Sequence, residues 1–157
     1  FVMMDCDELW EDFGKAKKEF IESGASGSVA PMFTYFKSPK WRFEKYDDYH
    51  VPFIFKLYET SVVGNFYMSN EGNILICDPT RKVNHNRVCH VIKEAMHHFS
   101  WVRNDIMMKV RNSSAQANIA NSKRLEDYNN PDCGPGYYVE DFKQKLIEVE
   151  NIFNIEL

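Results

Sequence analysis

Apolar and polar residues alternate along this chain with two different periods, and the period changes from one segment to the next. Residues 11–23 repeat their apolar positions at helical spacing, so we expect a helix there that ends at Gly24. Residues 28–36 alternate with the period of a strand, in spite of Pro31. The chain therefore begins as a mixture of helices and strands.

The middle of the chain extends this mixture. We expect further strands at residues 51–58, at residues 73–77 and around residues 94–101. A helix should begin near residue 104, because apolar residues recur there at helical spacing. The apolar face of that helix is formed by Ile106, Met107 and Val110.

The C-terminal part contains one strong break in the pattern. Residues 129–136 are rich in Asn, Pro and Gly and predict a loop. After it, apolar residues at helical spacing predict a C-terminal helix over about residues 139–153. The whole order predicts a single α/β domain over residues 1–157, with a mixed sheet flanked by helices.

The first eight residues combine an apolar run with a cluster of acids. Residues 1–4 are apolar and Asp5, Asp7 and Glu8 follow at once, which predicts a short buried strand that delivers carboxylates to the mouth of a sheet. Asp5 and Asp7 can turn toward one point if the backbone stays extended through Cys6. Paired carboxylates suit Mn²⁺ or Mg²⁺, ions that commonly bridge a protein to substrate phosphates. The alternative is an acidic turn that caps the following helix.

Composition narrows the function classes. The net charge is −4 and no block of lysine or arginine occurs, which argues against a nucleic-acid partner or an anionic membrane surface. No apolar stretch has the length of a transmembrane segment, and no secretory signal is visible. The cysteines are scattered without a C-x-x-C pair, so we expect free thiols in a reducing, cytoplasmic environment.

A histidine pair, His97-His98, lies on a predicted strand. Neighbouring strand residues point to opposite faces, so one metal ion should take only one of the two. One histidine is then free to join Asp5 and Asp7. Two carboxylates and one imidazole, with open positions for phosphate oxygens and water, suit Mn²⁺.

Two segments resemble glycosyltransferases of the GT-A fold, especially family 2-like enzymes. Residues 1–10, FVMMDCDELW, resemble the strand and D-x-D-E segment of that family. Residues 98–103, HFSWVR, resemble the later element in which histidine precedes an aromatic residue and often carries the third metal ligand. The resemblance covers roughly residues 1–110 and implies a GT-A (Rossmann-like) domain of which this chain is the C-terminal, acceptor- and metal-binding portion.

The resemblance also implies the chemistry. A divalent ion held by Asp5, Asp7 and His98 would lie against the diphosphate of a nucleotide-sugar donor, and the sugar would pass to a glycan or another hydroxyl acceptor. The family's nucleotide-binding half precedes the D-x-D strand. A central parallel strand also needs neighbours and crossover connections. We therefore expect the sequence to be part of a longer enzyme.

Further residues are candidates for acceptor and phosphate contacts. An inverting enzyme needs a carboxylate base near the acceptor hydroxyl, and Asp78 at the end of a predicted strand is the best placed, although it also reads as an Asp-Pro turn. The competing carboxylates are Glu44, Asp47 and Asp48. Trp41 can stack on an acceptor sugar, and Arg81 or Arg103 can meet phosphate.

Two other classes of protein remain open. A metal-dependent nucleotidyltransferase also presents paired carboxylates to phosphates, but no glycine- and lysine-rich phosphate loop is visible. A non-catalytic carbohydrate-binding or interaction domain would use the acidic turn only as a cap. Metal binding in the presence and absence of a nucleoside diphosphate separates the binding domain from both enzymes.

Overall fold

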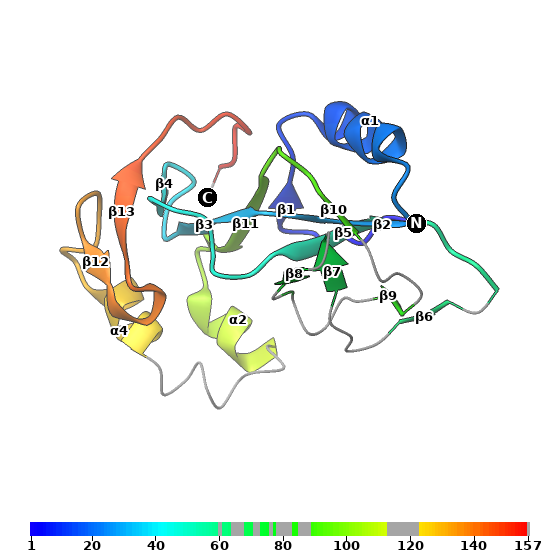
Figure 1. Ribbon diagram of the computed structural model, residues 1–157. Helices are drawn as coiled ribbons and strands as arrows, with labels where there is room; N and C mark the ends of the chain where they lie inside the picture. Colours follow the sequence, from blue (N-terminus) through cyan, green and yellow to red (C-terminus); the bar gives the residue numbers. More distant parts are fainter. Residues whose placement is uncertain are drawn as a thin grey trace. The chain divides into compact units, whose positions relative to one another are not determined.

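A computed structural model describes residues 1–59, 61–63, 68–70, 73–75, 77, 83–84, 89–112 and 123–156. The chain divides into two compact units. The first unit comprises Phe1–Phe33 and Tyr46–His98, and the second comprises Thr34–Lys45 and Phe99–Leu157. The boundaries between the units in the sequence fall within β3 (Met32–Phe36) and β11 (Met96–Trp101), two of the strands labelled in Figure 1. Helices and strands are interspersed, as the mixed α/β prediction requires.

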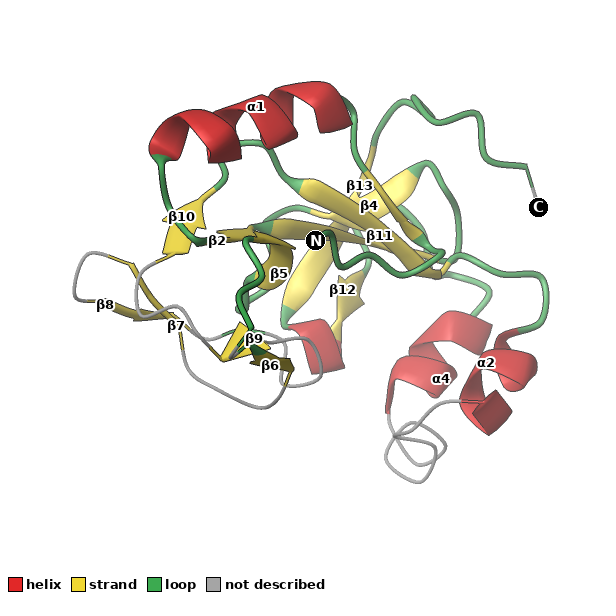
Figure 2. Ribbon diagram, turned by 90° about the vertical axis from the view of Figure 1, so that its right-hand side faces the viewer, coloured by secondary structure: helices red, strands yellow, loops and turns green. Residues whose placement is uncertain are grey.

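Helix α1 (Phe13–Ser23) confirms the first predicted helix. The Asp12 side chain caps its start by accepting the Lys15 N–H at 2.8 Å. Gly24 ends it in the left-handed conformation, with φ of 69°, which glycine adopts without steric cost. Ala16 and Phe20 turn inward and pack on the sheet that Figure 2 shows below the helix.

That sheet contains β10 (Cys89–Val91), β2 (Gly27–Ala30) and β5 (Val51–Phe55), with β2 in the centre. β10 runs parallel to β2 and β5 runs antiparallel to it, so the sheet is mixed. All five residues of β5 are buried, which confirms the first five residues of the strand predicted at 51–58. The single strand predicted at 28–36 is instead two strands, β2 and β3. They separate at Pro31, because proline has no N–H to continue the ladder.

The segment before the acidic cluster pairs with β5 and not with a parallel neighbour. Met3 N–H donates to the Phe53 carbonyl and Phe55 N–H to the Phe1 carbonyl, both at 2.9 Å, and Val2 forms an antiparallel bridge with Ile54. Phe1, Val2 and Met4 are exposed, so the prediction of a buried strand is wrong. A short apolar run fits an outer antiparallel segment as well as a central strand, and its sequence does not distinguish the two.

The smaller strands of the first unit form antiparallel pairs. β6 (Val62–Val63) pairs with β9 (Val83–Asn84), and β7 (Met68–Asn70) pairs with β8 (Asn73–Leu75). The strand predicted at 73–77 is thus present in its first three residues. Cys77 forms an isolated parallel bridge with His50.

In the second unit the strand order is β11, β3, β4 (Trp41–Phe43), β13 (Gln144–Glu148) and β12 (Tyr138–Val139), where β11 and β3 take part through their residues in this unit. Helix α2 (Ile106–Asn112) begins close to the predicted position. Ile106 and Val110, four residues apart, are buried, whereas Met107 is exposed. The prediction that Met107 belongs to the buried face is wrong, because one residue along a helix rotates the side chain by about 100°.

The predicted C-terminal helix over residues 139–153 is absent, and this prediction is wrong. The 3₁₀ turn η1 (Glu140–Phe142) comes first, Lys143 then has a left-handed backbone with φ of 52°, and β13 follows. β13 pairs with β4, and Leu146 is fully buried opposite Phe43. Pairing with a neighbouring strand has overridden the helical spacing of the apolar residues.

Helix α4 (Lys123–Asn129) was not predicted from the sequence. Residues 130–137, which follow it, belong to no helix or strand, so the predicted loop is confirmed, but it leads to β12 and not to a helix. Aromatic rings fill the core of this unit, with Phe43 stacked on Phe142 at 4.3 Å between ring centroids. No helix in the described part of the chain is long and apolar enough to cross a membrane.

Candidate functional site

The acidic cluster forms a closed turn. Glu8 N–H donates to the Asp5 carbonyl at 3.2 Å, and Asp5 N–H donates to Glu8 Oε2 at 2.8 Å. The turn bends at Cys6 and Asp7, so the expectation of an extended backbone through Cys6 is wrong. Glu8 is 1% exposed, and its carboxylate holds the turn. Sequence reasoning missed this role, although the three-residue spacing of Asp5 and Glu8 is typical of a turn closed by its last side chain.

Strand pairing brings this turn to the predicted histidine. β1 (Glu8–Leu9) is antiparallel to β11, with Glu8 opposite His98 and Leu9 opposite His97. As a result, His98 Nε2 lies 3.7 Å from Asp7 Oδ1. The two side chains are 19% and 20% exposed, so the contact is shielded but reachable from solvent.

The neighbouring histidine has different surroundings. His97 is 9% exposed, and its ring lies 5.9 Å from the ring of Phe33, measured between centroids. Adjacent strand residues face opposite sides, which explains the difference. His98 is therefore the histidine of the pair that lies beside the acidic turn.

The Asp7–His98 pair has a geometry that one metal ion can bridge. Oxygen and nitrogen ligands lie about 2.1 Å from such an ion, so two ligand atoms of one ion are at most about 4.2 Å apart. The 3.7 Å separation falls within this limit. Asp5 is exposed on the same turn. The described residues contain no group of three or more His, Cys, Asp or Glu side chains already gathered around one point.

The acidic turn does not cap helix α1. That role belongs to Asp12, whose Oδ1 accepts the Lys15 N–H. The alternative interpretation of the turn as a helix cap is therefore wrong.

Two predicted contact residues belong to the second unit. Trp41 lies on β4 opposite Glu148 and is partly exposed. Arg103 Nε donates to the Ser100 carbonyl at 3.0 Å, and the Arg103 carbonyl accepts the Tyr128 hydroxyl at 2.6 Å. These bonds hold Arg103 against its own unit.

The structure describes three of the four candidate carboxylate bases, Glu44, Asp47 and Asp48. Asp78 and Arg81 lie outside the described residues. Asp47 is half-buried, and its N–H donates to the Met32 carbonyl at 2.9 Å. Glu44 and Asp48 are exposed, in the second and the first unit respectively.

Comparison with known protein families, with curated proteins and with solved structures found no match for this chain.

Proposed function

We propose that this chain is the metal-binding part of a glycosyltransferase, which transfers a sugar from a nucleotide-diphosphate donor to a glycan or another hydroxyl acceptor. The observation that supports the proposal is the 3.7 Å contact between Asp7 and His98. The two motifs that resemble GT-A enzymes are far apart in the sequence, and this contact joins one residue from each. Chance matches to two short motifs have no reason to meet in the fold.

Each residue of the cluster has a defined role in this proposal. Asp7, next to β1, and His98, on β11, would hold the ion together with Asp5 at the start of the turn. Glu8 holds the turn closed and thereby keeps Asp5 and Asp7 on one short loop. When bound, Mn²⁺ or Mg²⁺ supplies positive charge that stabilises the departing nucleoside diphosphate.

The remaining roles follow from the chemistry of the side chains. Asp78 takes the proton of the acceptor hydroxyl, as an inverting reaction requires. Trp41, in the second unit, has a partly exposed ring of the kind on which a sugar can stack. Arg103, also in the second unit, carries a guanidinium group of the kind that suits phosphate.

The test is calorimetric titration of the complete enzyme with Mn²⁺ and with nucleoside diphosphates, each in the absence and presence of the other. We expect each ligand to tighten the binding of the other, because an ion held by Asp5, Asp7 and His98 would supply positive charge beside the diphosphate. The longer enzyme that the family resemblance implies, with its nucleotide-binding half, is then assayed for sugar transfer from a panel of nucleotide sugars with Mn²⁺ or with EDTA. Metal-dependent transfer that is lost in Asp7→Asn is the expected result.

Other outcomes separate the alternatives. Absence of any coupling between Mn²⁺ and nucleoside diphosphates contradicts the proposal. Release of pyrophosphate from a nucleoside triphosphate, without sugar transfer, identifies a nucleotidyltransferase. Sugar binding that is unchanged by metal and nucleotide identifies a carbohydrate-binding domain.

A further inference from the structure

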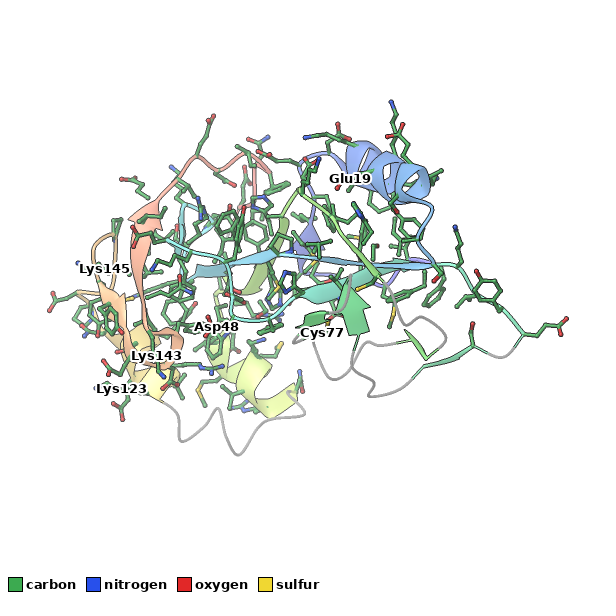
Figure 3. All side chains as sticks on the ribbon, in the orientation of Figure 1. Glu19, Asp48, Cys77, Lys123, Lys143 and Lys145 are labelled. Atoms are coloured by element: carbon green, nitrogen blue, oxygen red, sulfur yellow. The ribbon has the colours of Figure 1, made fainter. Side chains whose placement is uncertain are left out.

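A shallow hollow in the second unit gathers lysine side chains. Its lining residues, here called the lysine hollow, are Glu44, Lys45, Tyr138, Lys143, Gln144 and Lys145. Figure 3 shows Lys143 and Lys145 beside β13. Three lysines and one glutamate give the lining a charge of +2, whereas the whole chain carries −4. The hollow is therefore a local site of positive charge on an acidic protein.

The backbone around the hollow is held by hydrogen bonds. Lys45 N–H donates to Gln144 Oε1 at 2.9 Å, and Glu44 N–H donates to the Lys145 carbonyl at 3.1 Å. Tyr138 lies directly opposite Lys145 in the antiparallel pair of β12 and β13, so both side chains stand on the same face. The fold thus presents an aromatic ring and an ammonium group side by side on paired strands.

The lysines are available to a ligand. Lys45, Lys143 and Lys145 are exposed, and none of them forms an ion pair with another residue that the structure describes. Lys143 itself has a left-handed backbone at the end of η1, where the chain turns into β13. An incoming anion therefore does not have to displace an internal partner of any of these ammonium groups.

We infer that the lysine hollow binds an anionic carbohydrate, that is, a glycan that carries carboxylate or sulfate groups. The three ammonium groups attract the anion, and the 46%-exposed ring of Tyr138 offers an apolar surface to a sugar ring. The hollow has a volume of about 260 Å³, smaller than the roughly 300–1,000 Å³ of typical small-molecule pockets. It therefore accommodates one charged unit of a longer chain.

In a glycosyltransferase this glycan would be the acceptor. That interpretation rests on the proposed function, whereas the binding of the glycan does not. The lysine hollow contains none of Asp5, Asp7 and His98. Binding is accordingly measured in EDTA and without nucleotide, so that failure of the metal site and failure of the hollow give separate results.

The experiment compares oligogalacturonate, a sulfated oligosaccharide and a neutral oligosaccharide of equal length by calorimetry at low salt. We expect at least one of the two anionic probes to bind, the neutral probe to bind at least tenfold more weakly, and affinity to fall as salt is raised. Lys143→Gln combined with Lys145→Gln should lower the affinity for the anionic probe at least tenfold. Tyr138→Ala should lower the affinity for the anionic probe several-fold. Inorganic sulfate, which has no sugar ring, should bind weakly and equally to the wild type and to Tyr138→Ala.

The matched control is Lys40→Gln, an exposed lysine at the other end of β4 from Lys45. It should retain wild-type affinity, and all variants should unfold at the wild-type temperature because the changed side chains are exposed. Equal losses in Lys40→Gln and the double variant would overturn the inference. So would equal affinity for the neutral probe, or equally tight binding of a single-stranded oligonucleotide of the same charge.

Discussion

Glu8 lies directly opposite His98 in the antiparallel pair of β1 and β11, and the same glutamate closes the turn that carries Asp5 and Asp7. One buried carboxylate therefore connects both halves of the candidate metal site. It fixes the turn through the Asp5 N–H, while the strand register that it shares with His98 fixes the distance between Asp7 and the histidine.

Replacing Glu8 should affect both folding and metal binding. Glu8→Ala removes the acceptor of the Asp5 N–H from a buried position, which should lower the free energy of unfolding by about 1–3 kcal/mol. Mn²⁺ affinity should also fall, because the turn no longer holds Asp5 and Asp7 in place. Urea denaturation and calorimetry measure the two effects. Glu11→Ala, at an exposed site on the same segment, should change stability by less than about 0.5 kcal/mol. Unchanged Mn²⁺ affinity in Glu8→Ala would show that the turn does not position the ligands.

Substitutions of Asp7 and of His98 should have similar effects on metal binding. Asp7→Asn and His98→Ala should each lower Mn²⁺ affinity by at least about tenfold, because each removes a ligand atom. High Mn²⁺ should partly restore nucleotide binding in both variants. His90→Gln changes a histidine of the same unit that binds Glu19, and it should retain metal affinity. The same loss of Mn²⁺ affinity and the same rescue in His97→Ala would contradict the choice of His98 as the metal ligand.

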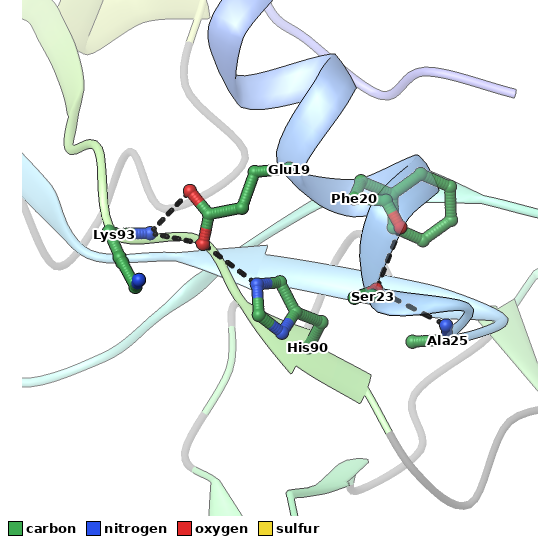
Figure 4. Close-up of polar contacts among 6 residues, drawn as sticks. All are labelled: Glu19, Phe20, Ser23, Ala25, His90 and Lys93. Carbon is green, nitrogen blue, oxygen red and sulfur yellow. Dashed lines mark hydrogen bonds and ion pairs between the residues drawn. The ribbon is translucent and has the colours of Figure 1, made fainter.

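The Glu19 side chain should contribute to the attachment of helix α1. Glu19 Oε1 lies 2.8 Å from His90 Nε2, and the Lys93 N–H approaches Oε1 at 3.2 Å and Oε2 at 3.3 Å (Figure 4). Glu19→Ala should lower the free energy of unfolding by about 1–3 kcal/mol. Glu22→Ala on the same helix removes only an exposed 3.8 Å pair with Lys18 and should cost less than about 0.5 kcal/mol. Equal costs in urea denaturation would contradict this role of Glu19.

The cysteines should differ sharply in reactivity. Cys6 is exposed, whereas Cys77, Cys89 and Cys133 are buried, and all are free thiols. Burial raises the pKa of the Cys89 thiol to about 12 and also raises the pKa of Cys133, so both stay protonated near neutral pH. A thiol reagent should therefore label one site rapidly in the native protein, and Cys6→Ser should remove that fast phase. Two or more fast sites in the native state would contradict the described burial.

Stability should decline in mild acid because of His50. Burial lowers the pKa of His50 below 6.5, its ordinary value, so the unfolded chain binds a proton more readily than the folded one. Above about pH 6.5 His50 is neutral in both states and does not change the free energy of unfolding. Below about pH 6.5 the unfolded chain binds the proton more readily, so the free energy of unfolding falls as the pH drops. Urea denaturation of the wild type and of His50→Gln between pH 5 and pH 8 measures the difference. Parallel curves across this range would show that His50 does not contribute.

Elements whose signals are local can be predicted from the amino-acid sequence. Helix α1 follows from its apolar spacing, the capping side chain of Asp12 and the left-handed Gly24, all within one short stretch. β5 follows from a run of apolar residues that suits a buried strand. The choice of His98 as the histidine beside the acidic turn followed from the family resemblance, and the opposite facing of strand neighbours explains why His97 lies elsewhere.

Features that depend on a partner distant in the sequence could not be predicted, because they arise from strand pairing in the folded chain. Residues 139–153 have helical spacing, yet β13 forms there because β4 offers a strand to pair with and Leu146 is buried opposite Phe43. The register of β1 against β11 places Asp7 beside His98, and the acidic segment alone contains no information about that register. The lysine hollow likewise exists because β12, β13 and the end of β4 bring together residues from both ends of the second unit. Local chemistry sets which elements form, and the pairing of strands sets which side chains meet.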